Sequence, residues 1–294
     1  MKSLIVGMGI GNLYREVLSN LGHEIVTVDL DPSKAHYTSV QDAVAAHEYF
    51  DTVHICTPNF THKDIAYEVA PYAKIVFVEK PGLRTAQDWH DMVKAFPYTR
   101  FMMVKNNQWR DNIRELQRLA SKSVRVELFW INKNRVPGPG TWFTTKSLAY
   151  GGVSRDLMTH LLSLFQALNY SYDTAPIIEA SAEQRYSLED VSDTEYGTVK
   201  ADGVYDVDDV CKFVFKGPQR EWFLVADWRS TTVDQRAIRF TMVDGAKEKF
   251  ELGLCPVEAY QNMISDAIAN LDNQSFWNDQ REKDVWIHER MDQL

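Results

Sequence analysis

Cysteine is scarce in this sequence of 294 residues, which contains only Cys56, Cys211 and Cys255. The number is odd and no CxxC pair occurs, so we do not expect a disulfide framework of the secreted kind, and a reducing cytoplasm fits better. The histidines show no metal-ligand spacing with cysteines or acidic residues. We therefore expect a cytoplasmic protein without a bound metal.

Basic charge and long apolar runs are scarce as well. Lys and Arg total 32 against 41 Asp and Glu, a net charge of −9, so we expect neither a nucleic-acid partner nor binding to an anionic membrane surface. No run of about 18 apolar residues occurs, and glycines interrupt the apolar start MKSLIVGMGIG too early for a signal peptide. These absences predict an intracellular protein that does not bind membranes.

The acidity is confined to one segment of the chain. Between Ser171 and Val210 there are 11 acidic residues against only Arg185 and Lys200, and the rest of the chain is neutral. We interpret this segment as a solvated loop and sheet edge, whose charges discourage pairing with other strands.

The sequence has the composition of an ordinary globular protein, with 45% hydrophobic and 25% charged residues. Its length exceeds the usual single core, so we expect two domains. Up to Val104, short apolar runs alternate with amphipathic stretches, which predicts an α/β domain with a parallel sheet and helices on both faces. The predicted strands are residues 3–6, 24–29, 52–56, 74–78 and 100–104.

Beyond Val104 the alternation of strands and helices ends. The predicted helices cover 112–120, 152–168, 257–271 and 280–291, and the predicted strands cover 123–132, 209–215, 221–228, 237–243 and 247–252. Four successive strands with few helices between them predict a mostly antiparallel sheet in an α+β domain. We predict one domain of residues 1–105 and a second of residues 106–294.

Gly7, Gly9 and Gly11 lie between the first predicted strand and the first predicted helix. Glycines suit a tight turn at which the backbone approaches a pyrophosphate, and the helix N-terminus offers amide donors to that anion. The spacing departs from GxGxxG, because Gly11 comes one residue early and Asn12 takes the place of the third glycine. The turn, including Ile10, is our candidate cofactor site, and a turn without a ligand is the alternative.

Asp29 ends the second predicted strand, 20 residues after Gly9. A carboxylate at this position can accept hydrogen bonds from a ribose diol and would repel a 2′-phosphate. It therefore favours NAD as the cofactor, with NADP left open. The alternatives are a solvated loop aspartate, or Asp31 in the same role.

Polar segments follow the third and fourth predicted strands. The first contains Thr57, Pro58, Asn59 and His62, and the second contains Glu79, Lys80 and Pro81. In an open parallel sheet, ligands lie outside the carboxyl ends of the strands, so we expect both segments at the cofactor crevice. A surface Glu–Lys pair beside a turn proline is the alternative for the second segment.

One predicted helix begins after Gly151 and Gly152 and contains Asp156 and His160. These two residues are four apart, so they share one face of the helix. A neighbouring carboxylate can orient an imidazole and raise its basicity, which general base catalysis requires. A helical Asp–His pair without chemistry is the alternative.

In this order, these segments resemble those of the Gfo/Idh/MocA oxidoreductases, the family of glucose–fructose oxidoreductase and inositol dehydrogenase. The specific part is the EKP triplet together with Asp-x-x-x-His after paired glycines, and the resemblance extends to the region Asp208–Gly217. It implies an N-terminal Rossmann domain, a C-terminal domain with an open, mostly antiparallel sheet, a nicotinamide cofactor and a sugar or polyol substrate. It also implies a homo-oligomer, a dimer or tetramer, formed through the C-terminal sheet.

The resemblance assigns roles to individual residues. Lys80 would contact the substrate and the nicotinamide, with a cis peptide bond to Pro81, and His160 would be the general base, with Asp156 beside it. The residues implied to line the cofactor are Thr57, Pro58, Asn59, His62, Glu79 and Lys80.

The substrate contacts are less well defined. Asn107 matches a family asparagine, but an Arg-aromatic pair usually near it is replaced by residues 108–110, and Ser163 replaces a family aspartate. Trp142 and Arg155 are further candidates for substrate binding, and for Arg155 a surface role is the alternative.

The implied reaction moves a hydride between a carbinol carbon and the nicotinamide while the hydroxyl proton goes to a base. An imidazole, with an unperturbed pKa of about 6.5, suits that task near neutrality, and Lys80 can stabilise negative charge on the oxygen. The alternatives are an NAD-dependent glycosidase of the same family and a non-catalytic NAD(P)-binding regulatory protein. The joint presence of Lys80, Asp156 and His160 argues against the regulatory protein.

Overall fold

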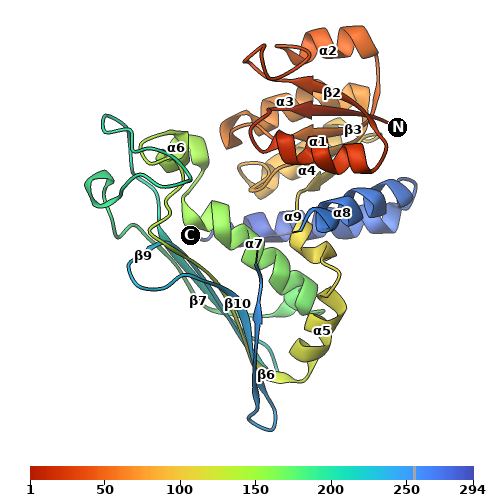
Figure 1. The fold of residues 1–294 in the computed structure, drawn as a ribbon. Helices are drawn as coiled ribbons and strands as arrows, with labels where there is room; N and C mark the ends of the chain where they lie inside the picture. Colours follow the sequence, from red (N-terminus) through yellow and green to blue (C-terminus); the bar gives the residue numbers. More distant parts are fainter. Residues whose placement is uncertain (254–255) are drawn as a thin grey trace. The chain divides into compact units, whose positions relative to one another are not determined.

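The computed structural model describes residues 1–253 and 256–294, so Cys255 lies outside the described residues. The chain forms two compact units (Figure 1). The first comprises Met1–Trp109 and Pro256–Glu289, and the second comprises Arg110–Cys255 and Arg290–Leu294. This division differs from the predicted domains mainly in the C-terminal helices.

The first unit is built on a five-stranded parallel sheet, as predicted. In the spatial order β2-β1-β3-β4-β5, its strands are β1 (Lys2–Val6), β2 (Glu24–Val28), β3 (Phe50–Ile55), β4 (Ala73–Val78) and β5 (Arg100–Met103). The strands are apolar because both faces of a parallel sheet are covered. In β4, every residue from Ile75 to Val78 is at most 1% exposed. The turns that follow β1, β3 and β4 lie at the carboxyl edge of the sheet.

Four helices connect these strands: α1 (Gly11–Asn20), α2 (Val40–His47), α3 (His62–Val69) and α4 (Ala86–Ala95). The start of α4 is fixed by a capping box, in which Thr85 and Asp88 each bind the other's backbone amide. Within the described parts of the chain, no helix has both the length and the apolar character that crossing a membrane requires.

The C-terminal helices α8 (Val257–Ala269) and α9 (Gln274–Met291) complete the core of the first unit. Met263 and Ile264 of α8 and Trp277 of α9 belong to one buried cluster with Tyr14 of α1. In addition, Asp266 accepts a hydrogen bond of 2.9 Å from the indole of Trp109. The sequence predicts both helices from their apolar periodicity, but periodicity does not tell which core a helix covers.

The second unit contains a six-stranded sheet in the order β11-β10-β6-β9-β8-β7. Its strands are β6 (Ser123–Lys133), β7 (Ile177–Glu183), β8 (Val210–Lys216), β9 (Glu221–Ser230), β10 (Gln235–Met242) and β11 (Lys247–Glu251). The pair β6–β9 is parallel and the other pairs are antiparallel, which confirms the expected mostly antiparallel sheet. Strand β7 was not predicted from the sequence.

Helix α7 (Val153–Leu168) lies along one face of this sheet, beside α5 (Ile113–Ser121), and the short α6 (Lys146–Ala149) precedes it (Figure 1). In β6, Val126, Leu128 and Trp130 are buried on the covered face, whereas the residues between them on the other face are half-buried. Phe165 of α7 meets Trp222 of β9 edge to face, with ring centres 5.1 Å apart. Aromatic packing thus holds α7 on the sheet.

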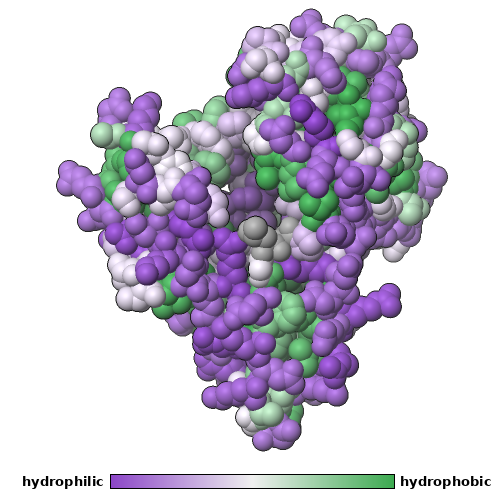
Figure 2. Space-filling model, viewed as in Figure 1, coloured by the Kyte–Doolittle hydropathy of each residue, from purple (hydrophilic) through white to green (hydrophobic). Residues whose placement is uncertain are grey.

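Both edges of the second sheet carry charge. The edge strand β7 contains Glu179 and Glu183, and β11 at the opposite edge contains Lys247, Lys249 and Glu251. On the lower part of the molecule in Figure 2, where β6 and β10 are labelled in Figure 1, hydrophilic residues surround a smaller hydrophobic patch. Charged edges disfavour pairing with further strands. The acidic segment found in the sequence includes the edge strand β7.

Candidate functional site

The fold explains two of the three glycines in the turn after β1. Gly7 has φ +92°, and a Cβ there would lie 2.8 Å from the carbonyl oxygen of Cys56, so only glycine fits. A Cβ on Gly11 would lie 2.9 Å from Ile5, where α1 packs on β1. At Gly9, in contrast, a Cβ would meet nothing within 4 Å, and the residue is exposed. Close approach of a ligand to the backbone would explain a glycine at position 9.

The N-terminus of α1 follows this turn and has no side-chain cap. Its N-cap residue, Ile10, is 46% exposed. Asn12, in the place of the third glycine, donates a hydrogen bond of 2.5 Å to the carbonyl oxygen of Met8 and so closes the turn. An uncapped helix N-terminus next to a glycine turn suits the diphosphate of a dinucleotide.

Asp29, directly after β2, connects that strand to the glycine turn. Its Oδ2 accepts a hydrogen bond of 2.7 Å from the backbone N–H of Met8, and its Oδ1 accepts one of 2.9 Å from Asp31. Each carboxylate oxygen can accept a second bond, so binding of a ribose diol remains compatible with these contacts. Asp31 itself is exposed and bonds to Ser33, which lowers the pKa of Asp31. Asp29 is thus the better placed of the two for the predicted role.

The turn after β4 carries Lys80. The Lys80–Pro81 peptide bond is cis, as the resemblance implied. Glu79 is buried, and its carboxylate accepts hydrogen bonds from the Tyr14 hydroxyl at 2.5 Å and from the backbone N–H of Lys80 at 3.0 Å. Burial, followed by the charge of Glu79, raises the pKa of Tyr14, so this hydroxyl stays a donor. Glu79 therefore fixes the backbone at Lys80 from the interior.

His62 lies inside the protein, between the turn after β3 and the turn that carries Lys80. Its side chain is 1% exposed, with Nδ1 2.8 Å from the carbonyl oxygen of Gly82 and Nε2 2.8 Å from that of Thr57. Burial lowers the pKa of His62, and the two carbonyl contacts oppose that effect. We predicted His62 to line the cofactor, and this arrangement indicates that it holds the two turns together.

Helix α9 supports the Lys80 turn from a second direction. Nε2 of His288 on α9 lies 2.9 Å from the carbonyl oxygen of Leu83 and 3.2 Å from the indole nitrogen of Trp89. Gly82 has φ +82°, and a Cβ there would lie 2.7 Å from Trp89. The turn is therefore packed too closely for any residue other than glycine at this position.

A buried ion pair joins α9 to the end of β5. The ammonium group of Lys105 bonds to the carboxylate of Asp284, and both side chains are 0% exposed. Asp284 also accepts a hydrogen bond of 2.9 Å from the backbone N–H of Met103. Burial raises the pKa of Asp284 and lowers that of Lys105, and the attraction within the pair opposes both shifts. The only sequence signal for this pair was a lysine directly after an apolar strand.

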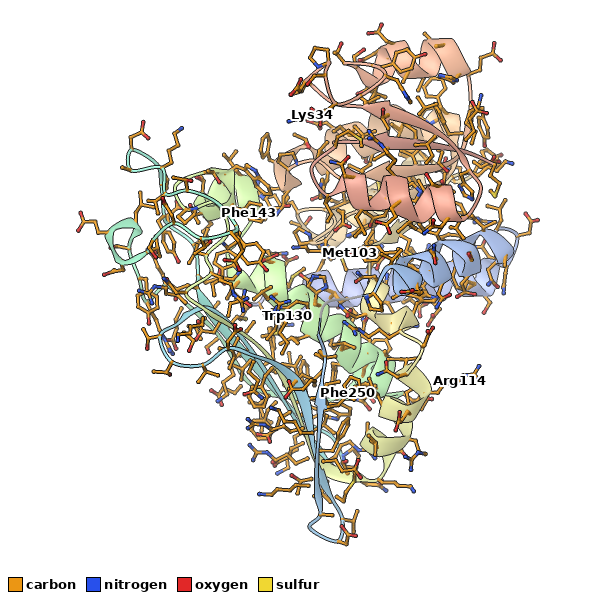
Figure 3. All side chains as sticks on the ribbon, in the orientation of Figure 1. Lys34, Met103, Arg114, Trp130, Phe143 and Phe250 are labelled. Atoms are coloured by element: carbon orange, nitrogen blue, oxygen red, sulfur yellow. The ribbon has the colours of Figure 1, made fainter. Side chains whose placement is uncertain are left out.

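In the second unit, Asp156 and His160 lie on one face of α7, as their spacing predicted. Asp156 Oδ2 accepts a hydrogen bond of 2.8 Å from the indole of Trp228 on β9. The ring of His160 stacks on Trp130 of β6, with ring centres 4.9 Å apart and an angle of 18° between the planes. Trp130 is labelled in Figure 3. Two tryptophans that the sequence analysis did not assign to the site thus fix the orientations of both residues.

The paired glycines before α7 have a structural reason. Asp208 accepts hydrogen bonds from the backbone N–H groups of Gly152 and Ser154, at 2.9 and 2.7 Å, and so caps the helix. A Cβ on Gly152 would lie 1.8 Å from the carbonyl oxygen of Asp208. Glycine is therefore required at this position, and Asp208 positions the helix that carries Asp156 and His160.

The remaining candidates have varied surroundings. Asn107 is fully buried in the first unit. In the second unit, Arg155 forms an ion pair of 2.8 Å with Asp292, and Trp142 stacks on Phe143, with ring centres 4.0 Å apart. Their roles in substrate binding stay predictions. Ser163, in place of a family aspartate, donates a hydrogen bond to the backbone carbonyl of His160. Within the described residues, no group of three or more His, Cys, Asp or Glu could hold a metal ion.

The N-terminal part of the chain matches a known protein family. Residues 3–104 match the Gfo/Idh/MocA model, described as an oxidoreductase family with an NAD-binding Rossmann fold. This match confirms the resemblance found in the sequence and identifies the first sheet as the NAD-binding fold of that family. A curated protein of Amycolatopsis mediterranei, named as a UDP-kanosamine synthase oxidoreductase subunit, is 27% identical over 151 residues. That alignment covers 47% of this chain and 42% of the relative, less than half the length of either protein.

Solved structures resemble the whole chain. GenD2 from gentamicin A biosynthesis, in complex with NAD, has a TM-score of 0.74 at 19% identity, covering 99% of this chain and 92% of that one. A levoglucosan dehydrogenase in complex with NADH and levoglucosan has a TM-score of 0.74 at 14% identity, with 100% and 96% covered. At such identities the likeness establishes the fold of both units.

Proposed function

We propose that this chain, whose residues 3–104 carry the NAD-binding Rossmann fold of the Gfo/Idh/MocA oxidoreductase family, is a dehydrogenase that moves a hydride between a sugar or polyol carbinol and NAD. The observation that carries the proposal is the position of Lys80. It follows β4 at the sheet edge where the glycine turn follows β1, and His62 joins its turn to Thr57. An ammonium group at the edge of a nucleotide crevice suits stabilisation of an alkoxide.

The residues around the glycine turn fit a dinucleotide. Gly9 leaves open space for close approach, α1 presents an uncapped N-terminus, and Asp29 offers carboxylate oxygens for a ribose diol. The negative charge of Asp29 supports NAD over NADP because it would repel a 2′-phosphate. When bound, the nicotinamide supplies the hydride acceptor.

The proton transfer is assigned to the second unit. His160 takes the hydroxyl proton at a ring nitrogen, while Trp130 holds the imidazole plane by stacking. Asp156, fixed by Trp228, lies one helical turn from His160 and favours the imidazolium that forms. Lys80 stabilises the negative charge that develops on the same oxygen. The names of the levoglucosan dehydrogenase and of the UDP-kanosamine synthase subunit support a sugar as the substrate.

The open face of the second sheet is the proposed contact with a second copy of the chain. Its centre contains half-buried apolar residues, Phe223 and Val225 of β9, on the face that α7 does not cover. We expect Phe223→Glu to shift the protein towards a monomer in light scattering coupled to size-exclusion chromatography. An unchanged mass would contradict this contact.

A screen of sugars and polyols for NADH formation tests the proposed activity. With an active substrate, Lys80→Ala and His160→Ala should each abolish turnover and retain measurable NADH binding. The controls are Lys94→Ala and His90→Ala, because both residues are exposed on α4 and lie outside the proposed site. Near wild-type activity of Lys80→Ala and His160→Ala would contradict the catalytic roles. Retained NAD with sugar hydrolysis and no net redox change would instead identify the glycosidase alternative.

A further inference from the structure

Trp130 contacts the cationic side chain of Arg236 as well as the imidazole of His160. Arg236 of β10 is the direct partner of Trp130 in the sheet register, and its guanidinium carbon lies 5.2 Å from the centre of an indole ring of Trp130. Residues directly opposite each other on neighbouring strands project from the same face of a sheet. Arg236 is therefore on the face that α7 covers, where His160 stacks on the same indole.

No carboxylate of the described residues matches the charge of Arg236. It forms no ion pair with any residue that the structure describes. Its Nη2 is 3.5 Å from Asn132 Oδ1 and 3.5 Å from the hydroxyl of Tyr196, two neutral groups at the limit of hydrogen-bond distance. Arg135, which also contacts Asn132, differs because it is paired with Asp234.

Neighbouring acidic residues are directed elsewhere or already bonded. Asp227 on β9 pairs in register with Ile131, so it projects from the opposite, open face of the sheet. Asp156 on α7 accepts its hydrogen bond from Trp228. Arg236 thus presents a positive charge without a counter-ion among the described residues, beside the candidate base.

We propose that Arg236 binds an anionic group, a carboxylate or a phosphate, on the substrate whose hydroxyl group gives its proton to His160. The inference rests on the proposed function and narrows the substrate class to sugar acids and sugar phosphates. A guanidinium matches either anion with two parallel hydrogen bonds. Contact with the indole of Trp130 limits the motion of the guanidinium before a substrate arrives.

Removal of this charge should change substrate selection more than the chemical step. Arg236→Gln is expected to raise KM for an anionic sugar by about 10- to 100-fold, the usual effect of losing a charge-assisted hydrogen bond, with a smaller change in kcat. Arg236→Lys should recover part of the loss, because it keeps the charge and loses the planar pair of donors.

The experiment measures kcat and KM on the full chain with NAD. The substrates are glucose and galactose, their uronates and their 6-phosphates. A preference for the uronates identifies a carboxylate as the anion that Arg236 binds, and a preference for the 6-phosphates identifies a phosphate. Either preference supports the proposal if Arg236→Gln abolishes that preference. The matched control is Arg239→Gln, because Arg239 lies on the same strand and 4.9 Å from the ring of Phe129, on the opposite face. It should leave the preference unchanged, and thermal unfolding of both variants reports on folding.

Three outcomes would overturn the proposal. Equal oxidation of neutral and anionic sugars that Arg236→Gln does not alter would refute the anion site and leave the proposed function intact. If Arg236→Gln lowers kcat/KM equally for neutral and anionic sugars, Arg236 has a structural role and does not bind the anion. Absence of NADH formation with every neutral and anionic sugar tested would overturn the proposed function together with this inference.

Discussion

Replacement of Asp284 by Asn tests the buried ion pair that attaches α9 to β5. Both partners are 0% exposed, so the variant would leave the ammonium group of Lys105 in the interior without a counter-charge. Breaking a buried pair in this way costs about 3–5 kcal/mol of unfolding free energy. The amide of Asn can still accept the N–H of Met103, so the change removes the charge and keeps that hydrogen bond. In a chain of this size the loss corresponds to a fall in Tm of about 6–20 °C.

The matched control is Asp279→Asn on the same helix. Asp279 is also paired with a lysine, Lys283, at 2.7 Å, but its side chain is 50% exposed. Exposed pairs of this spacing contribute about 0.3–0.5 kcal/mol, so the control should lose no more than about 2 °C. Thermal unfolding followed by circular dichroism measures both variants.

The pH dependence provides a second readout for Asp284→Asn. Burial lowers the pKa of Lys105 below its value in the unfolded chain. Below the pKa of Lys105 in the folded variant, its ammonium group is charged and buried, and the destabilisation has its full size. As the pH rises from that pKa towards the pKa in the unfolded chain, the folded variant loses the charge and the destabilisation decreases. Its size relative to wild type should shrink in alkaline buffer. Equal Tm values for the Asp284 and Asp279 variants would refute the reasoning.

Three further outcomes are expected. Gly9→Ala should leave Tm unchanged, because the new Cβ meets no protein atom within 4 Å. It should weaken NADH binding about tenfold, which corresponds to a steric clash with the ligand of about 1.4 kcal/mol. Unaltered NADH affinity in fluorescence titrations would exclude a ligand at this glycine. His62→Gln should lower kcat more than NADH affinity, because the Lys80 turn loses its bond at Gly82, and an unchanged kcat would contradict this. Burial lowers the pKa of His54 to about 3. As the pH falls below the unfolded pKa of about 6.5, only the unfolded chain gains a proton at this residue. The unfolding free energy of the wild type therefore falls by about 1.4 kcal/mol per pH unit. His54→Phe should lose less stability in urea unfolding over the same range, and a parallel loss would refute this role of His54.

The parallel sheet was predictable because its strands are short, apolar and separated by amphipathic helices. In contrast, β7 was missed because the sequence IIEASAE mixes apolar and acidic residues in an edge strand that is largely exposed. An edge strand needs little apolar surface, so it leaves a weak signal. The register in which β7 pairs with β8 depends on contacts between distant parts of the chain, and the sequence pattern does not reveal them.

The candidate site was predictable where chemistry depends on local spacing. The positions of Asp156 and His160 on one helix face followed from their separation by four residues. The partners of these residues did not, because Trp228 and Trp130 belong to strands far away in the sequence. The same limit applied to Asp284, which is 179 residues from Lys105. Long-range pairs of this kind are set by packing, and a single sequence carries no direct record of them.

The return of α8 and α9 to the first unit affects the order in which the protein can fold. A ribosome releases residues 1–109 long before Met263, Ile264 and Trp277, whose side chains complete the cluster around Tyr14. Domains generally fold as units, so the nucleotide-binding unit has to wait until nearly the whole chain has emerged. The main segment of the second unit is complete earlier. The part of the chain that is made first is therefore expected to fold last, and a fragment that ends after Trp109 would expose the core that these helices cover.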